Sequence, residues 1–551
     1  MRCVRVPLFD TFIVRYVTPY REMLYIVIRR VRCIMKKIEN YLLGMDCGTT
    51  NIKAVILGED GVVVCEASRP NQFINPGPGM QEQDARKWWS NAVEIFRQIT
   101  DEAGTDIVKR IRGISISSHT VSLLPLDANG EPLRNAITYQ DGRSSAQLDE
   151  IVEKLGREKY VDIVGAQPSV AFLPSKLLWF KTHEPELFEK TDAVLQCSSF
   201  INYKLTGVLS SDVDQASRTQ CMDRTTLKWS HEFGDAMGID LDSILPPPRP
   251  VDDIIGFVSS EAAEETGLLA GTPVIAGCSD AMASMYATGM SRLGEAGEAS
   301  GTTSLVFVGS TEPSAPDVPV VTRPCGIEGV PWIFDAPIQA SGASLKWFID
   351  TMAAEEKLTA EAEGKNIYEY LNELALQAPA GCRGLFYFPY LLGERAPIWN
   401  NYAKGMFIGL GMDTSRAELT RSIFEGTAFA LRHVMETIKE SGGSARTLRV
   451  CGGGAKSRTW NQIKASMLKM PVYILADDSG DVPVGDCMIV GRKVGVFSSF
   501  EEASNRAIRV KEIVQPVDEW VKAYDKLYPY YVKFYQDLDK DLCALKQTLE
   551  G

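Results

Sequence analysis

The sequence has 551 residues, which is more than one hydrophobic core usually serves, so we expect at least two domains. The hydrophobic content of 45% and charged content of 23% are typical of a soluble globular protein, and the net charge of −13 argues against nucleic acid or an anionic membrane as the main partner. The 12 cysteines are scattered without a C-x-x-C pair, which favours reduced thiols in a cytoplasmic protein over a disulfide framework or a zinc site.

Residues 1–34 differ from the rest of the chain. They carry seven arginines and two acidic residues, and their longest apolar run, residues 23–28, is far too short to cross a bilayer. Such a basic, hydroxyl-poor start is only a weak match to a targeting peptide. We expect folding to begin near Met35, with residues 1–34 a disordered leader or a mis-assigned start.

A first domain is expected over residues 35–289, and it opens with two apolar strands joined by a short turn, residues 41–57. The turn region is polar and contains Asp46, Gly48, Thr49, Thr50 and Lys53. Backbone N–H groups and hydroxyls in a glycine turn can hold phosphate oxygens, a carboxylate can hold hydrated magnesium, and a lysine can neutralise charge. Taken alone, the stretch fits a structural hairpin with a polar tip equally well.

Polar residues follow several predicted strands of the first domain. A helix is expected from about 81 to 99, and a strand over 112–118 runs into His119, Thr120 and Val121. A short strand over 136–139 leads to Gln140-Asp-Gly-Arg143, and residues at strand ends often line sites in α/β folds. A buried strand and a glycine then lead to Asp280 at a helix start, where capping is the ordinary role of an aspartate.

A second domain is expected over residues 290–551, because the pattern restarts there. Gly301-Thr302-Thr303 repeats the earlier Gly-Thr-Thr turn before another apolar strand, which indicates an internal duplication. An apolar strand ending at 451 leads to a glycine-rich turn and a helix start, a suitable backbone cradle for a nucleotide, although no P-loop motif is present. Helices are expected over 416–440 and about 520–549, the latter kinked or broken at Pro529 and packed on this domain.

These stretches resemble the FGGY family of carbohydrate kinases over about residues 40–531. The most specific match is Gly405-Met-Phe-Ile-Gly-Leu410 followed, after seven residues, by Glu418-Leu-Thr-Arg-Ser-Ile-Phe-Glu425, which is similar to the C-terminal signature of the family. Lys176-Leu-Leu-Trp-Phe-Lys-Thr-His183 resembles its other signature. Residues 81–84, 139–143 and 393–395 look most like those of the xylulokinase members.

The resemblance implies an α/β fold of the actin-like, hexokinase type, with two duplicated domains that close around ATP–Mg²⁺ and a small sugar. It implies an ATP-dependent kinase of a free sugar hydroxyl, with no nucleic-acid or membrane partner and with a homodimer as an open option. Asp280 then falls on the catalytic base and Asp46 on the magnesium-side aspartate. The implied ATP-binding residues are Thr49, Thr50, Lys53, Gly301, Thr302, Gly342, Lys346, Gly453, Gly454, Ala455 and Arg458. The implied substrate-binding residues are His119, Thr120, Val121, Tyr139, Asp141 and Asp280.

The chemistry agrees with these residue types. Phosphoryl transfer depends mainly on positioning and on neutralising charge at the γ-phosphate, which turn N–H groups, threonine hydroxyls, Lys53 and Mg²⁺ can do. A sugar hydroxyl is a weak nucleophile, and a carboxylate such as Asp280 can take its proton.

The resemblance fails where the sugar would bind. Xylulokinases and gluconokinases carry Met-His where this chain has Thr120-Val121, and a missing hydrogen bond to substrate can change discrimination by orders of magnitude. His119 either replaces the lost imidazole or has no substrate role, and on this alignment Val121→His should raise turnover of xylulose. In addition, Gly485-Asp486-Cys487 replaces the usual Gly-Ala-Ala at a helix start, which puts close helix packing there in question.

Two alternatives stay open at this point. The substrate can be xylulose or a related pentulose, or another sugar derivative such as gluconate, a polyol or a different ketose. A non-catalytic, ATP-binding protein of the actin-like fold is the alternative from another functional class.

Overall fold

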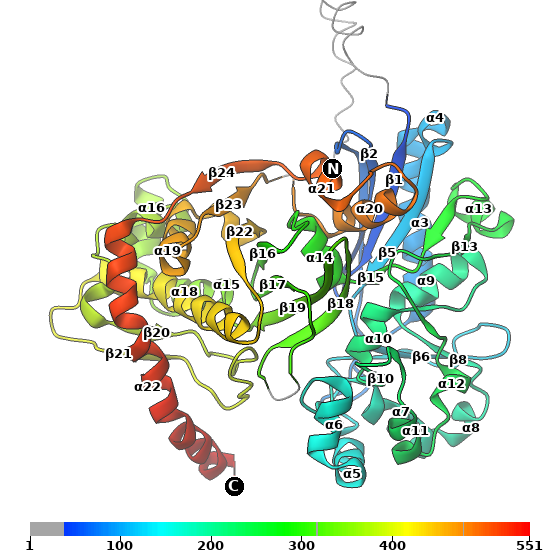
Figure 1. Ribbon diagram of the computed structural model, residues 1–551, viewed down its shortest axis with the longest axis horizontal. Helices are drawn as coiled ribbons and strands as arrows, with labels where there is room; N and C mark the ends of the chain where they lie inside the picture. Colours follow the sequence, from blue (N-terminus) through cyan, green and yellow to red (C-terminus); the bar gives the residue numbers. More distant parts are fainter. Residues whose placement is uncertain (1–37, 316–317, 478, 551) are drawn as a thin grey trace, which may run out of the picture.

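The computed structural model describes residues 38–315, 318–477 and 479–550, and it shows two halves, each built on a mixed β-sheet with helices around it (Figure 1). The predicted leader, residues 1–34, lies outside the described residues. Every strand of the first sheet precedes Asp280, and every strand of the second sheet follows Arg292. We therefore propose the boundary that the sequence predicts, between residues 289 and 290.

The first sheet has the strand order β13-β14-β5-β1-β2-β3, and β15 also pairs with β5. Its central strand, β1, is antiparallel to β2 and parallel to β5. The strands are β1 (Tyr41–Cys47), β2 (Asn51–Gly58), β3 (Val63–Pro70), β5 (Ile111–Ser118), β13 (Ile254–Phe257), β14 (Pro273–Ile275) and β15 (Cys278–Ser279). Helices α3 (Ala85–Ala103), α4 (Thr105–Val108), α9 (Cys197–Thr206), α13 (Ser260–Thr266) and α14 (Asp280–Ala287) belong to this half.

A smaller sheet and a group of helices extend the first half. The sheet has the order β4-β7-β6-β8, formed by β4 (Glu82–Gln83), β7 (Ala136–Thr138), β6 (Ser122–Leu126) and β8 (Ala193–Leu195). The helices are α5 (Ser145–Leu155), α6 (Arg157–Val164), α7 (Leu173–His183), α8 (Pro185–Phe188), α10 (Val213–Thr219), α11 (His231–Met237) and α12 (Leu241–Ile244). Two short strand pairs complete it: β9 (Ser211–Asp212) with β12 (Pro248–Arg249), and β10 (Met222–Asp223) with β11 (Lys228–Trp229).

The second sheet repeats the plan of the first. Its order is β18-β19-β17-β16-β22-β23-β24, with central β16 antiparallel to β17 and parallel to β22. The run β19-β17-β16-β22-β23-β24 therefore matches β3-β2-β1-β5-β14-β13 in both order and strand direction. The strands are β16 (Gly294–Ser300), β17 (Ser304–Ser310), β18 (Val321–Ile327), β19 (Val330–Ile338), β22 (Ala445–Cys451), β23 (Val472–Leu475) and β24 (Val510–Val514). This correspondence is the predicted duplication, and it places both Gly-Thr-Thr turns after a central strand.

Eight α-helices of the described chain begin at Gly342 or later and belong to the second half (Figure 1). They are α15 (Gly342–Thr351), α16 (Ala354–Ala362), α17 (Ile367–Ala375), α18 (Arg416–Glu440), α19 (Arg458–Leu468), α20 (Val482–Lys493), α21 (Phe500–Ala507) and α22 (Asp518–Glu550), with β20 (Phe386–Phe388) paired to β21 (Met406–Ile408). The predicted bounds of α18 are confirmed, because Ser415 and Glu418 form a reciprocal capping box at its start.

Two predicted helices differ from the structure. The helix expected from residue 81 begins at Ala85, because the Asp84 side chain accepts a hydrogen bond from Arg86 N and so caps it there. The C-terminal helix is not broken at Pro529 but runs through it. Its tyrosines Tyr524 and Tyr531 are buried in the aromatic core of the second half, and this packing outweighs the hydrogen bond that proline removes.

The two halves meet where α14 and α20 pack on one another and α20 packs on β1 and β5. A Cβ at Gly44 would lie 2.0 Å from the carbonyl oxygen of Pro483, and one at Gly485 would lie 2.0 Å from that of Ala283. The close packing that Asp486 put in question is therefore present, since the Asp486 side chain fits between β5 hydroxyls.

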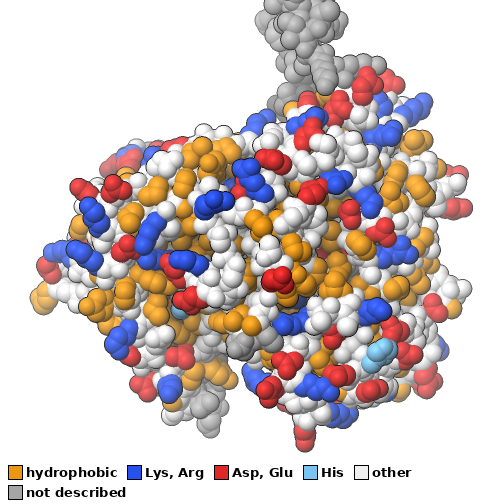
Figure 2. All heavy atoms as spheres, viewed as in Figure 1, with side chains coloured by type: hydrophobic (Ala, Val, Ile, Leu, Met, Phe, Trp, Pro, Cys, Tyr) orange, Lys and Arg blue, Asp and Glu red, His pale blue; other side chains and the backbone are white. Residues whose placement is uncertain are grey.

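The surface bears charges of both signs. Figure 2 shows Lys and Arg side chains interspersed with Asp and Glu over one face of the molecule. Within the described part of the chain, no helix combines the length and apolarity needed to span a bilayer.

We predict that Gly44→Ala lowers the midpoint of thermal unfolding, because the new methyl group would overlap the Pro483 carbonyl and overpacking of this kind costs about 3 kcal/mol. Gly142→Ala is the matched control, since a Cβ there meets only the Gly79 carbonyl, at 3.6 Å. Thermal unfolding followed by circular dichroism measures both. Equal midpoints for the two variants would contradict the close approach of α20 to β1.

Candidate functional site

The first Gly-Thr-Thr turn joins β1 to β2 and is held from behind. Asn71 donates from its side chain to Gly48 O (3.1 Å) and from its backbone N–H to Thr50 O (2.8 Å). The Gln83 side chain donates to Thr49 O (2.9 Å). These bonds fix the carbonyl groups of the turn. The remaining N–H groups and hydroxyls of the turn are therefore held in a defined orientation.

The second Gly-Thr-Thr turn joins β16 to β17 and is clamped by the start of α15. Gly342 N donates to Gly301 O (3.0 Å), and Ala343 N donates to Thr302 O (2.9 Å). A Cβ at Gly342 would lie 2.4 Å from Gly301 O, so this contact requires glycine. Beneath the turn, a buried ion pair joins Lys464 to Glu298 at 2.8 Å.

The glycine-rich turn after β22 packs against the end of β16. Gly452 has a φ of 81°, and a Cβ there would lie 2.7 Å from Ser300 O. A Cβ at Gly454 would lie 2.1 Å from Ser300 Oγ. The glycines therefore allow this turn to lie directly beside the second Gly-Thr-Thr turn.

A cavity of about 840 Å³ opens between these elements of the second half, a volume that suits a nucleotide. The predicted residues that line it are Gly301, Thr302, Gly342, Lys346, Gly453, Gly454 and Arg458. The sequence did not reveal its outer wall, which is formed by α17 and its flanks with Asn366, Tyr368, Glu369, Asn372, Glu373 and Leu376, and by Trp460. The only available signal was the spacing of Tyr368, Asn372 and Leu376 on one helix face.

A second cavity of about 590 Å³ borders the same glycine turn and is lined by residues of both halves. Lys53 from β2 lines it together with Gly453 and Ala455, two of the other predicted ATP-binding residues. Lys53 forms ion pairs with Glu66 (3.0 Å) and with Asp481 (2.5 Å) at the start of α20. The predicted phosphate-neutralising lysine is thus already held between two carboxylates.

Asp280 is the first residue of α14, but its neighbour caps the helix. The Ser279 side chain accepts from Met282 N, while Asp280 Oδ1 accepts from Ala281 N at 2.7 Å. Burial raises the pKa of Asp280 to about 6, and the positive charge of Arg218 opposes that rise. Capping alone therefore does not account for this aspartate.

Asp46 lies at the end of β1, close enough to Asp280 for their charges to interact. Burial raises the pKa of Asp46 well above its ordinary value, and the charges of Asp280 and Asp486 add to the rise. The Ser117 hydroxyl on β5 lies 3.4 Å from Asp46 Oδ1. The region around the end of β1 is thus rich in carboxylates.

A buried charge network behind Asp280 was missed by sequence reasoning. Asp214 on α10 accepts from Ser279 N (2.9 Å) and pairs with Arg218 (2.8 Å). Arg218 also pairs with Asp335 on β19, at 2.6 Å, so the network ties the start of α14 to the second half. The spacing of Asp214 and Arg218 at i and i+4 was visible in the sequence but lay in a region that looked like loop.

The segment expected to select the sugar is mostly buried. His119 is 1% exposed, and its two ring nitrogens contact Cys47 O (3.0 Å) and Ser122 Oγ (3.1 Å). A carbonyl only accepts, so Nδ1 carries the proton, and burial lowers the pKa of His119 to about 4. This arrangement favours the alternative in which His119 has no substrate role.

Thr120 and Val121 have different surroundings. Val121 packs in an apolar cluster with Leu123 and Ile137, so Val121→His would bury an imidazole there rather than restore a sugar contact. The Thr120 hydroxyl is buried, and it makes no hydrogen bond within the described chain. Of the three residues, Thr120 alone offers an unpartnered polar group.

Tyr139 and Asp141 follow strand β7, and Tyr139 lies beside the first turn. The Tyr139 hydroxyl is 3.5 Å from Thr49 Oγ1, which brings a predicted sugar residue beside a predicted phosphate residue. Asp141 instead accepts from Gln81 N (2.5 Å) and from Arg143 Nη2 (2.7 Å). Burial favours a raised pKa for Asp141, but the bonds from Arg143 and Gln81 hold that pKa below its ordinary value.

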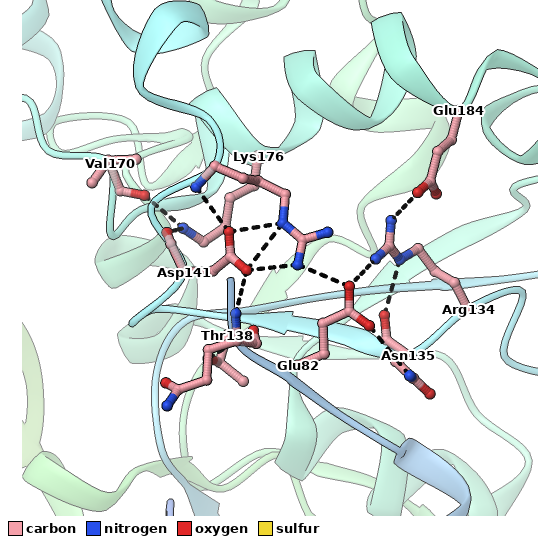
Figure 3. Close-up of polar contacts among 10 residues, drawn as sticks. Glu82, Arg134, Asn135, Thr138, Asp141, Val170, Lys176 and Glu184 are labelled. Atoms are coloured by element: carbon pink, nitrogen blue, oxygen red, sulfur yellow. Dashed lines mark hydrogen bonds and ion pairs between the residues drawn. The ribbon is translucent and has the colours of Figure 1, made fainter. Parts of the chain in front are cut away.

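Figure 3 shows that Asp141 belongs to a wider buried network. Lys176 donates to the backbone carbonyls of Asp141 (3.1 Å) and Val170 (2.5 Å), and Arg134 bridges Glu82 and Glu184. Burial lowers the pKa of Lys176 to about 8, although the nearby charge of Asp141 opposes this. The geometry gives Asp141 a role in holding the strand ends that carry Gln81 and Tyr139.

Comparison with known proteins identifies the family. Models of the N-terminal and C-terminal domains of the FGGY family of carbohydrate kinases match residues 41–287 and 299–491. The chain is 30% identical over 521 residues to a xylulose kinase of Bacillus subtilis (strain 168), a match that covers 92% of this chain and 100% of the relative. The chain belongs to the FGGY family of carbohydrate kinases.

Other relatives of this FGGY kinase agree with that assignment. A gluconokinase of Bacillus subtilis (strain 168) is 27% identical over 514 residues, which covers 93% of this chain and 99% of the relative. The crystal structure of a xylulose kinase from Rhodospirillum rubrum superposes with a TM-score of 0.83 at 28% identity, covering 91% of this chain and 100% of the other.

The predicted actin-like fold with two duplicated α/β domains is thereby confirmed, and so is the predicted enzyme class. The protein is a sugar kinase, a family activity that uses ATP and acts on a small molecule. The non-catalytic alternative is correspondingly disfavoured.

We predict that Gly342→Ala weakens ADP binding about 10-fold, because its methyl group would push α15 off the second turn at a cost of about 1–3 kcal/mol. Isothermal titration with ADP measures the change, and Gly142→Ala again serves as control. An unchanged dissociation constant for Gly342→Ala would contradict a nucleotide site at this turn.

Proposed function

We propose that the protein transfers the γ-phosphate of ATP to a hydroxyl of D-xylulose or a closely related pentulose, with Asp280 as general base. The observation that carries the proposal is the state of Asp280, an aspartate with a raised pKa whose neighbour Ser279 caps the helix. A base with a pKa near 6 is ionised at neutral pH and still basic enough to accept a proton from a hydroxyl in the transition state.

The two turns supply the phosphate end of this reaction. The N–H groups and threonine hydroxyls of Gly48–Thr50 and of residues 301–303 would hold the phosphate oxygens from opposite halves of the chain. The adenosine would occupy the cavity beside Gly342 and Gly453. The γ-phosphate would then point toward Asp46 and Asp280, at the junction of the halves.

Magnesium fits the carboxylates at that junction. In residues 38–315, 318–477 and 479–550, no group of three or more His, Cys, Asp or Glu side chains could hold a metal ion by itself. Mg²⁺ commonly uses one or two protein carboxylates and completes its shell with substrate phosphates and water, so Asp46 suffices as the protein anchor. When bound, the ion would offset negative charge on the phosphates.

The protein residues then perform the remaining chemistry. Asp280 would orient the attacking hydroxyl and accept its proton, while Arg218 keeps the base ionised by opposing the rise of its pKa. Tyr139 would lie between the sugar and Thr49, because its hydroxyl is 3.5 Å from the Thr49 hydroxyl. Asp141 would act indirectly, by fixing the backbone on which Gln81 and Tyr139 lie.

D-Xylulose is the preferred acceptor because a xylulose kinase matches 92% of the chain at 30% identity. Thr120 would contact the sugar in place of the missing imidazole, since its buried hydroxyl has no partner in the described chain. Gluconate is the second candidate, favoured by the gluconokinase relative at 27% identity. A cytoplasmic location and a homodimer remain predictions from the sequence.

We predict that Asp280→Asn abolishes acceptor-dependent ADP release by at least about 100-fold while the fold is retained, because the amide cannot accept the proton. For the unaltered enzyme, kcat/KM should fall as the pH drops through about 6, where the base becomes protonated. A coupled ADP-release assay measures both.

Asp106→Asn is the control for this substitution, since Asp106 lies exposed in the first turn of another helix, α4. Full activity of Asp280→Asn would remove Asp280 from the mechanism. A pH profile that stays flat from pH 8 to pH 5 would also contradict its role as base.

For the sugar, we predict that D-xylulose gives the highest kcat/KM in an ADP-release panel that also contains D-gluconate, polyols and deoxysugars. Thr120→Val should raise the KM for the preferred sugar about 10-fold, because it removes one substrate hydrogen bond, while Thr120→Ser should restore most of the affinity. A preference for gluconate would reject xylulose in favour of the second candidate, and an unchanged KM in Thr120→Val would reject the Thr120 contact.

A further inference from the structure

Asp486 is a fully buried carboxylate on α20 that bonds across the junction of the two halves. Its Oδ1 accepts from the Ser115 hydroxyl at 3.0 Å, and its Oδ2 lies within hydrogen-bond distance of the Ser117 hydroxyl, at 2.7 Å. Both serines lie on β5 of the first sheet, while Asp486 comes from the second half of the chain. No local pattern in the sequence indicates a partner for Asp486.

Ser117 links Asp486 to the metal-side carboxylate. The same Ser117 hydroxyl lies 3.4 Å from Asp46 Oδ1 on the neighbouring strand, where Asp46 and Ser117 are register partners. Ser115 is also bonded to Asp486, but its register partner on β1 is Gly44, which has no side chain. The two serines thus make the same type of bond to Asp486, and they differ in their relation to Asp46.

The position of Asp486 is strictly defined by its surroundings. A Cβ at Gly44 would lie 3.0 Å from Asp486 Cβ and 2.0 Å from Pro483 O, so α20 lies directly on β1 at this point. Asp486 therefore cannot move without moving the helix, and the Ser117 hydroxyl is fixed to a rigid element. A metal-ligating carboxylate that is oriented by a hydrogen bond of this kind usually binds its ion more tightly.

We propose that Asp486 is a positioning residue for the metal ion of the reaction: it holds the Ser117 hydroxyl, and through that hydroxyl it orients Asp46. This inference rests on the proposed function, in which Asp46 anchors Mg²⁺. It adds a chain of polar contacts, Asp486–Ser117–Asp46, through which the second half of the chain sets the geometry of the metal side of the first half. A serine hydroxyl has one proton, so Ser117 donates to Asp46 when Asp486 is protonated and in turn donates from Oδ2 to Ser117 Oγ. The full burial of Asp486 favours this protonated form.

The test is a titration with Mn²⁺ in place of Mg²⁺, followed by the electron paramagnetic resonance signal of free Mn²⁺ in the presence of saturating ADP and without sugar. Ser117→Ala and Asp486→Ala should each weaken Mn²⁺ binding about 10-fold, the usual effect of removing a partner of a metal-ligating carboxylate. Ser115→Ala, the matched control, should change it less than about 2-fold. Asp486→Asn can donate from its side-chain amide to Ser117 Oγ and should restore most of the affinity.

A double variant shows whether Asp486 acts through Ser117. If it does, Ser117→Ala with Asp486→Ala should bind Mn²⁺ no more weakly than Ser117→Ala alone, because both changes break the same chain. Additive losses, or equal effects of Ser115→Ala and Ser117→Ala, would overturn the inference. If Asp486→Ala fails to fold, the comparison of Ser117→Ala with Ser115→Ala still tests the inference.

The outcome also separates this inference from the proposed function. Unchanged Mn²⁺ affinity in folded Ser117→Ala and Asp486→Ala, with normal binding by the unaltered protein, would overturn the role of Asp486 alone. Failure of the unaltered protein to bind Mn²⁺ together with ADP would contradict both proposals.

Discussion

The structure depends on the contact of one helix from the second half of the chain with the sheet of the first half. Helix α20 lies so close to β1 and α14 that neither Gly44 nor Gly485 has room for a methyl group. This contact fixes the central strands of the two sheets relative to each other, and with them the two Gly-Thr-Thr turns. Because each turn directly follows its central strand, a phosphate chain bound between the halves would, on the proposed function, meet donors from both.

Charge at the junction complements this geometry. Asp486 is fully buried, Asp46 and Asp280 are half-buried, and desolvation is the main cause of the raised pKa of all three. Negative charge that is partly removed from water is costly unless a cation or protons offset it, so the junction is suited to a divalent ion that arrives with a nucleotide. In the buried Asp214–Arg218–Asp335 network, the positive charge of Arg218 opposes the rise of the Asp280 pKa, and its pair with Asp335 connects this region to the second sheet.

Sequence reasoning succeeded where local pattern and chemistry coincide. The two Gly-Thr-Thr turns, the duplication and the bounds of α18 could be predicted, since strand periodicity, glycine turns and the capping box are local signals. It failed where tertiary packing, and not the local sequence, determines the structure. Helix α22 runs through Pro529 because buried tyrosines stabilise it, and the wall of the 840 Å³ cavity comes from α17, which carries no motif. The hydrogen bonds from Gln81 to Asp141 and between His119 and Cys47 also join residues distant in sequence, which no local pattern reveals.

The most direct test of the account is a crystal structure of the protein with Mg²⁺, a non-hydrolysable ATP analogue and D-xylulose. We predict that the γ-phosphate lies between the turns at residues 48–50 and 301–303, and that one sugar hydroxyl lies about 2.6–3.2 Å from an Asp280 oxygen. The metal should be on the Asp46 side. A nucleotide bound away from these turns, or a sugar whose hydroxyls all point away from Asp280, would contradict the account.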